Sequence, residues 1–255
     1  MEKTTTLLSA PVHVIDDRRR VVILEDATAG ARFATRFIIQ QAAECSQNKG
    51  SYSIALSGGS TPKEIYHLLS TETFRHEIEW SRVRLFWSDE RCVPPTDIDS
   101  NYRMAMDAGF QDLPIDATQI FRMHGELDPV KAAADYSEVL KEHLPRSRFD
   151  LVMLGMGPDG HTASLFPGTE GLKSTEPYAI ANPVPQKETT RLTLTFPCIN
   201  SAAQTLFTVF GASKADKVRE VLSSKGHENP AFHIGTKEAP ALWLLDEESA
   251  HGLLS

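Results

Sequence analysis

The sequence has few cysteines, no excess of positive charge and no long apolar run. Its three cysteines, Cys45, Cys92 and Cys198, are odd in number and far apart, so they indicate neither a disulfide framework nor a zinc site. Lysine and arginine number 26 against 34 aspartates and glutamates, a formal net charge of −8. This balance argues against nucleic acid as a partner. No apolar segment approaches the roughly 18 residues of a membrane span, so we expect no membrane partner.

The N-terminal segment also lacks the apolar core of a signal peptide, because MEKTTTLLSAPVHVIDDRRR soon turns charged. Together with the scattered cysteines, this predicts a soluble cytoplasmic protein whose residues 1–10 form a flexible tail. The 255 residues are 41% apolar, enough to bury a core without disulfide or metal staples. Without repeats or long linkers, we expect a single domain over residues 1–255, and we favour a monomer.

Short apolar strands alternate with amphipathic helices after an N-terminal hairpin formed by VHVI and RVVILE. This alternation predicts an α/β fold with a mostly parallel sheet covered by helices on both faces. Ligands of such sheets bind beyond the carboxyl ends of the strands. The expected strands are 53–56, 83–87, 149–154, 191–196, 205–210 and 241–245, and the expected helices begin near Asp26, Thr61, Asp128 and Ser213.

The first polar loop is Ser57-Gly58-Gly59-Ser60-Thr61, which follows strand 53–56. Thr61, Pro62 and Glu64 fit a capping box, so we expect the next helix to have Thr61 as its N-cap. Backbone N–H groups and hydroxyls before the positive end of a helix are suited to hold a phosphate. An ordinary tight turn is the alternative. The loop is no Walker motif, because the Gly-Lys-Ser/Thr ending is missing.

Three basic residues and one acidic residue lie just after a strand or at the start of a strand or helix. Asp89 and Arg91 lie in the polar loop after strand 83–87, where opposite charges are often only solvated neighbours. Asn101-Tyr102-Arg103, beyond a proline-containing loop, is expected to fold over the same edge. Arg191 opens a strand, and Lys214 lies at a helix start, against the helix dipole. That unfavourable position suggests a bound anion, unless the lysine head simply reaches into water.

The segment after strand 149–154 carries the strongest chemical signal. It contains a literal Gly-x-Gly-x-x-Gly, but we reject a dinucleotide site, because Pro158 removes an amide and Pro167 leaves little room for a following helix. Asp159 and His161 remain, two residues apart on a glycine-rich turn. A histidine is suited to general-base catalysis, although a lone histidine is more often structural. Because metal-binding and serine-hydrolase signatures are missing, we expect no metal and no cofactor.

Three segments together resemble the 6-phosphogluconolactonase family: SGGSTP, FWSDERCVP with the downstream SNY, and above all GMGPDGHTASLFPG. The resemblance covers about residues 25–245. It implies a modified Rossmann-like α/β fold shared with glucosamine-6-phosphate deaminases. It also implies hydrolysis of a sugar-phosphate lactone, 6-phospho-D-glucono-1,5-lactone, to 6-phosphogluconate in the oxidative pentose phosphate pathway. The deaminases resemble this pattern with an acid five positions after the histidine, where this sequence has Phe166. That difference argues against amine chemistry.

Under this resemblance, His161 is the general base that activates water, and Asp159 orients His161 or shapes its turn. The phosphate is expected to rest on Ser57 to Thr61, with Arg191 and Lys214 as counter-charges. A deaminase-like enzyme and a non-catalytic sugar-phosphate sensor are the alternatives.

The sequence leaves two possible roles for each of Arg91 and Asp89. Arg91 either binds the phosphate or polarises the lactone carbonyl. Asp89 either holds Arg91 or binds the sugar hydroxyls. If the fold gathers these charges, the pocket should be locally positive on an acidic molecule.

Overall fold

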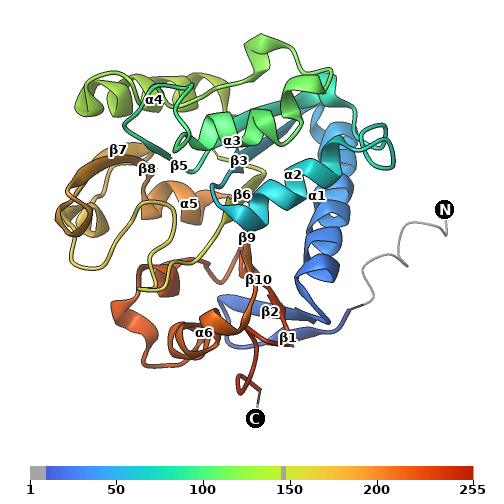
Figure 1. Cartoon of the computed structure of the whole chain (residues 1–255), viewed down its shortest axis with the longest axis vertical. Coiled ribbons are helices and arrows are strands. Elements are labelled where there is room, and N and C mark those ends of the chain that lie inside the picture. The colour runs from blue at the N-terminus through green and yellow to red at the C-terminus, as the bar shows by residue number, and fades with distance from the viewer. Residues whose placement is uncertain (1–9, 145–147, 255) are drawn as a thin grey trace.

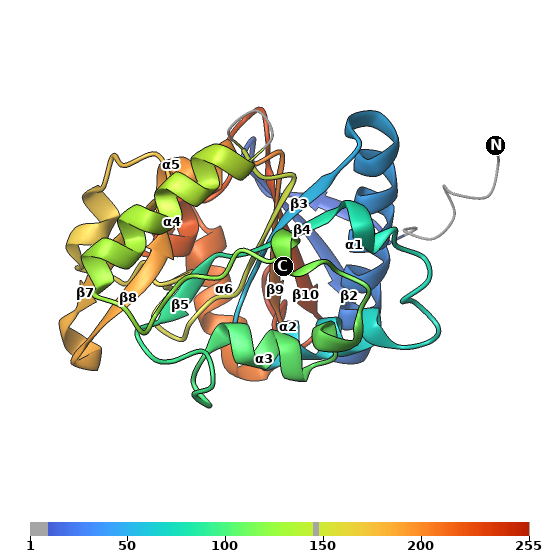
Figure 2. The same ribbon diagram turned by 90° about the horizontal axis from the view of Figure 1, so that it is seen from above.

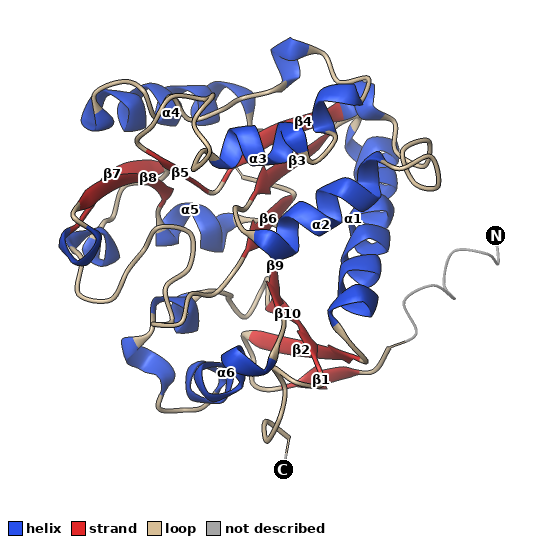
Figure 3. Ribbon diagram, in the orientation of Figure 1, coloured by secondary structure: helices blue, strands red, loops and turns tan. Residues whose placement is uncertain are grey.

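The computed structural model describes residues 10–144 and 148–254, and a seven-stranded sheet forms its centre (Figures 1 and 3). The strand order is β1-β2-β10-β9-β6-β3-β4. β1 and β2 form the predicted antiparallel hairpin, and the other neighbouring pairs are parallel. The mostly parallel α/β sheet is therefore confirmed. Its strands are β1 (Val12–Val14), β2 (Arg19–Leu24), β3 (Tyr52–Leu56), β4 (Val83–Trp87), β6 (Leu151–Leu154), β9 (Gln204–Val209) and β10 (Ala241–Asp246).

Helices cover both faces of this sheet, as the alternation predicted. α1, α2 and α3 pack on one face, and α4, α5 and α6 on the other; Figure 2 shows α1 and α4 on opposite sides of the strands. None of the helices in the described ranges combines the length and apolar character that a bilayer crossing needs. The helices are α1 (Ala27–Lys49), α2 (Ser60–Ser70), α3 (Asn101–Asp107), α4 (Pro129–His143), α5 (Phe196–Ser201) and α6 (Ala215–Leu222).

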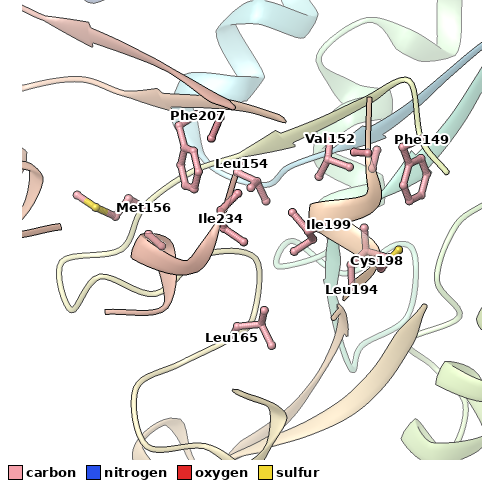
Figure 4. Close-up of a cluster of buried hydrophobic side chains, with 14 of the residues drawn as sticks. Phe149, Val152, Leu154, Met156, Leu165, Leu194, Cys198, Ile199, Phe207 and Ile234 are labelled. Carbon is pink, nitrogen blue, oxygen red and sulfur yellow. The ribbon is translucent and has the colours of Figure 1, made fainter. Parts of the chain in front are cut away.

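Strand β6 shows why the central strands read as continuous apolar runs. All four of its side chains are buried, because helices cover both faces. Val152 and Leu154 point to the α4 side, whereas Leu151 and Met153 point to the α1 side, as the alternation of a strand requires. Figure 4 shows Val152 and Leu154 with Ile199 and other side chains of the hydrophobic cluster on the α4 side of the sheet.

Local signals placed several helix ends correctly. Asp26 caps α1 by accepting a hydrogen bond from the Ala29 N–H, and Asp128 caps α4 in the same way. Gly50 ends α1 with φ 78°, a left-handed conformation that glycine adopts at little cost. The predicted helix from Ser213 begins as the short 3-10 helix Ala212–Lys214, which leads into α6.

The predicted capping box at the start of α2 is wrong. The helix begins at Ser60 with Gly59 as its N-cap, and no side chain caps it. Gly59 has φ 108°, which a residue with a side chain rarely adopts. The first N–H groups of α2 are thus not capped by Thr61. The predicted tail, residues 1–10, lies outside the described residues except for Ala10.

A second, three-stranded antiparallel sheet was not predicted. Its order is β5-β8-β7, with β5 (Asp89–Arg91), β7 (Ala179–Val184) and β8 (Thr189–Leu194). The segment Asp89–Arg91, expected in a polar loop, is instead a short strand in which Asp89 pairs with Thr193 and Arg91 with Arg191. This sheet lies beside α4, on the side of the main sheet away from α1 (Figure 2).

Candidate functional site

A pocket of about 220 Å³ lies beyond the carboxyl ends of β3, β4 and β6. Three of the predicted loops meet there, because each follows one of these neighbouring strands. Asn101, expected to fold over the same edge, also reaches the pocket. The lining residues are Ser57, Gly58, Gly59, Asp89, Arg91, Asn101, Gly155, Met156, Gly157, His161 and Ala163.

The predicted site residues fall into three groups. Those that line the pocket are Ser57, Gly58, Gly59, Asp89, Arg91 and His161. Asp159, Arg191 and Lys214 lie behind these and contact or pair with lining residues. Ser60 and Thr61 do not line this pocket; they line a neighbouring hollow between the first turns of α1 and α2.

His161 is held through one edge of its ring. Its Nδ1 lies 2.5 Å from Asp159 Oδ1, which also accepts a hydrogen bond from the His161 backbone N–H at 3.2 Å. Burial favours the neutral acid, but the hydrogen bonds and charge of His161 outweigh it and hold the pKa of Asp159 below 3.8. An ionised carboxylate can only accept a hydrogen bond, so the Nδ1 atom that faces it carries the proton. A neutral His161 therefore presents an unprotonated Nε2, which has no hydrogen-bond partner within residues 10–144 and 148–254.

The glycines of the Gly-x-Gly-x-x-Gly segment shape the turn that carries His161, residues 157–164, which we call the histidine turn. The Gly157 N–H donates to the His161 carbonyl at 2.9 Å, and a Cβ on Gly157 would lie 2.1 Å from ring atoms of His161. Gly160 has φ 77°, and a Cβ there would lie 2.3 Å from Asn229 Oδ1. The following segment contains the 3-10 helix Glu170–Lys173 in place of the long helix of a dinucleotide-binding unit.

The turn is anchored in the hydrophobic core at both ends. Met156 before it and Leu165 after it are buried in the same cluster as Leu154 of β6 (Figure 4). Thr162 closes the turn by donating from its hydroxyl to the Gly155 carbonyl at 2.9 Å. His161 thus projects from a rigid support, which a catalytic base requires.

Asp89 connects the second loop to the histidine turn. It is buried, and its Oδ2 accepts a hydrogen bond from Ser164 Oγ at 2.7 Å. Asn101 Nδ2 donates to the Asp89 carbonyl at 3.0 Å. The Arg91 guanidinium does not bond to Asp89, since it donates to the Asp99 carbonyl. In the part of the chain that the structure describes, Asp89 forms no ion pair with Arg91, so the first of the two roles considered for Asp89 is not seen.

Glu90 was not among the predicted site residues, yet it organises this edge. Its buried carboxylate accepts hydrogen bonds from the N–H groups of Arg91, Asn101 and Tyr102 at 2.7–2.9 Å and from Ser100 Oγ at 3.0 Å. Burial raises the pKa of Glu90, against the effect of these donors. The acid fixes the start of α3 and places Asn101 at the pocket. The signal in the sequence was an acid inside SDER followed by the helix start SNY.

Three cations gather around the pocket. Arg91 and Arg191 are directly paired between β5 and β8, and half-burial together with the Arg91 charge lowers the pKa of Arg191. Lys214 extends from the start of α6, where its Nζ donates to the Met156 carbonyl at 2.8 Å. Neighbouring cations repel one another unless an anion lies between them. Of these three cations, Arg91 lines the pocket, whereas Arg191 and Lys214 each contact or pair with a lining residue, so a locally positive pocket stays a prediction.

The comparisons with known proteins agree with the pattern of loops. A family model described as glucosamine-6-phosphate isomerases/6-phosphogluconolactonase matches residues 25–243. The 6-phosphogluconolactonase of Chlamydia pneumoniae is 35% identical over 237 residues, covering 92% of this chain and 90% of that protein. The one from Treponema pallidum is 37% identical over 228 residues and covers 88% of each. The solved structure of the Trypanosoma cruzi enzyme, 26% identical, matches 95% of this chain and 100% of that chain with a TM-score of 0.83.

Proposed function

The chain belongs to the glucosamine-6-phosphate isomerase/6-phosphogluconolactonase family, and we propose that it hydrolyses 6-phospho-D-glucono-1,5-lactone to 6-phospho-D-gluconate in the pentose phosphate pathway with His161 as general base. The observation that carries this proposal is the Asp159–His161 pair. The other ring nitrogen of His161 has no hydrogen-bond partner among the described residues, and His161 lines a pocket together with Arg91 and the loop before α2.

His161 Nε2 removes a proton from water as the water oxygen bonds to C1 of the lactone. The carbonyl oxygen of C1 becomes an oxyanion, and Asp159 stabilises the imidazolium through Nδ1. When the oxyanion collapses, the bond between C1 and the ring oxygen breaks, and the imidazolium returns the proton to that oxygen. The new carboxylic acid loses its proton to solvent. Lactone and water are consumed, the acid is formed, and the enzyme returns to its starting state.

The phosphate of the substrate is an anion of high charge, and the Ser57–Gly59 loop offers it uncapped N–H groups at the start of α2. Arg91 lines the same pocket, Arg191 pairs with Arg91 between β5 and β8, and Lys214 donates a hydrogen bond to the carbonyl of the lining residue Met156. We place the phosphate among these groups, which leaves the lactone ring toward His161. The N–H groups of the glycine-rich loops are then within the site to stabilise the oxyanion.

A deaminase-like activity is less well supported, because Phe166 occupies the position of the acid that the amine chemistry uses and stacks on the His161 ring. A non-catalytic sensor needs the anion site but no base, whereas this chain holds His161 in a hydrogen-bonded pair.

One paired assay separates the three functions. Fresh lactone is generated with glucose-6-phosphate dehydrogenase, and its loss is followed with and without the protein. Glucosamine-6-phosphate is tested in parallel for release of ammonia. Faster lactone loss without ammonia supports the proposal, binding without turnover supports the sensor, and ammonia release supports the deaminase.

We further propose a monomeric enzyme of the cytoplasm. The three cysteines are free, which is usual in a reducing compartment. Light scattering of the purified chain tests the monomer, and a dimer mass would contradict it.

A further inference from the structure

The ring of Phe166 lies against the ring of His161. Their centroids are 4.0 Å apart and their planes are inclined by only 25°. Phe166 is 5% exposed, whereas a quarter of the His161 side chain remains open to solvent. The phenyl ring therefore forms a buried wall on one face of a partly exposed imidazole.

The rest of the imidazole is constrained along one edge. Asp159 takes Nδ1, and Gly157 is so close that a Cβ on it would lie 2.1 Å from both Nδ1 and Cε1. With Phe166 on a ring face, Nε2 is the ring nitrogen that has no hydrogen-bond partner among the described residues. These contacts fix both the position and the plane of the ring, which a single hydrogen bond to an exposed aspartate does not achieve.

The chain folds back sharply to bring the two rings together. The Leu165 N–H donates to the Thr162 carbonyl at 2.9 Å, and between them Ala163 has φ 47°. A left-handed conformation is unfavourable for a residue with a side chain. The neighbouring structure must stabilise this turn, and the stack of Phe166 on His161 is one contact that does so.

Phe166 itself is held from the smaller sheet. Its carbonyl accepts hydrogen bonds from the N–H and the hydroxyl of Thr169, at 3.2 and 2.8 Å. The buried Asn182 of β7 donates through Nδ2 to Thr169 Oγ1 at 3.0 Å and to the Ser164 carbonyl at 2.8 Å. Phe166 is thus tied to a sheet, and it transmits that rigidity to a histidine on a solvent-facing turn.

We propose that Phe166 is a positioning residue, which by stacking on the imidazole keeps Nε2 of His161 aligned with the water that attacks the lactone. This inference rests on the proposed function of His161. A general base acts only when its nitrogen lies within hydrogen-bond reach of the proton, and small misplacements cost large factors in rate. Phe166 touches the base and contributes no group to the reaction itself.

The test compares Phe166→Leu with Phe166→Tyr. Loss of the aromatic face should lower kcat by about 10-fold or more, with KM changed less than about twofold, because the anion site is untouched. Phe166→Tyr keeps the ring and should retain most of kcat. A higher KM at unchanged kcat would overturn the proposal, since Phe166 would then only bind substrate.

The chain offers a matched control. Phe121 stacks on His143 at 4.4 Å and 30°, away from the pocket. Phe121→Leu should leave kcat and KM unchanged, and thermal unfolding is recorded for every variant. Should Phe166→Leu fail to fold, Phe166→Met replaces the ring with a flexible side chain of similar bulk. Equal losses of kcat in the Phe121 and Phe166 variants would overturn the proposal as an effect on stability alone.

A proton NMR measurement needs no substrate. A ring stacked on His161 shifts the imidazole CH signals upfield, and these signals are assigned by their loss in His161→Asn. They should move downfield in Phe166→Leu. A wild type that shows the upfield signals but hydrolyses no lactone would refute the proposed function and leave the stack in place. Unchanged signals in Phe166→Leu, or a lost stack with full kcat, would refute the positioning role.

Discussion

Ser164 donates a hydrogen bond from its hydroxyl to Asp89, at 2.7 Å between Oγ and Oδ2. The two residues are 75 positions apart, and both are buried. The Ser164 N–H also donates to Thr193 Oγ1 on β8 at 3.1 Å. One serine thus fastens the histidine turn to the smaller sheet, and the pocket depends on this connection for its shape.

Removing the Ser164 hydroxyl should therefore lower the stability of the fold. In Ser164→Ala, the buried Asp89 carboxylate loses its hydrogen-bond donor on Oδ2. We expect a loss of about 1–3 kcal/mol in the free energy of unfolding, the usual cost of a buried polar group left unpaired. Urea unfolding measures it. Ser81→Ala is the control, because Ser81 is exposed, and an equally small change in both variants would contradict the prediction.

His161→Ala tests the general base directly. We expect kcat to fall by about 10²- to 10⁴-fold, the usual contribution of such a base, while binding of phosphogluconate stays near the wild-type value. The coupled lactone assay measures turnover after spontaneous hydrolysis is subtracted. The exposed His67 on α2 provides the control variant His67→Ala. Near-wild-type turnover of His161→Ala would exclude this role.

Gly157→Ala tests the close approach of backbone and imidazole. The added Cβ would lie 2.1 Å from ring atoms of His161, so the ring must move away. We expect kcat to fall by about 10²-fold, as displacement of a catalytic group predicts. Gly155→Ala is a control for folding alone, measured by thermal unfolding, because its Cβ meets no protein atom within 4 Å although Gly155 lines the pocket. Wild-type turnover of lactone by Gly157→Ala would contradict the prediction, because a displaced imidazole would then still be productive.

The pH dependence of stability reports on Asp159. Burial opposes ionisation, but the hydrogen bonds and charge of His161 hold the pKa of Asp159 below 3.8 in the folded state. A carboxyl with a lowered folded pKa adds stability above its unfolded pKa, and this stability is lost as the pH falls through the folded value. The advantage of wild type over Asp159→Asn should therefore disappear as the pH falls below 3.8. Urea unfolding at a series of pH values tests this, and an advantage that grows in acid would contradict it.

Local chemistry in the sequence determined much of the framework. Asp26 and Asp128 cap their helices with side chains three residues from the N–H groups that they bind, and Gly50 supplies its own left-handed turn. The continuous apolar strands indicated a sheet that is covered on both faces. A parallel sheet then places loops after neighbouring strands at one edge, which is why Ser57, Asp89 and His161 were predicted together.

The start of α2 shows where local signals fail. Thr61, Pro62 and Glu64 had the spacing of a capping box, yet Gly59 with φ 108° became the N-cap. The spacing of residue types did not reveal the backbone conformation of Gly59, which places the N-cap two residues before Thr61.

Tertiary structure alone decided the rest, because those contacts join residues that are distant along the chain. The pairing of Asp89 with Thr193 joined the expected strand at 191–196 to a second sheet in place of the main one. In this sheet Asp89 bonds to Ser164 and not to Arg91. The sequence determined that Asp159, His161 and Phe166 share one short segment. Only the sharp turn at Ala163 and the hydrogen bonds from the smaller sheet decided that the Phe166 ring faces the imidazole, since packing depends on the whole fold.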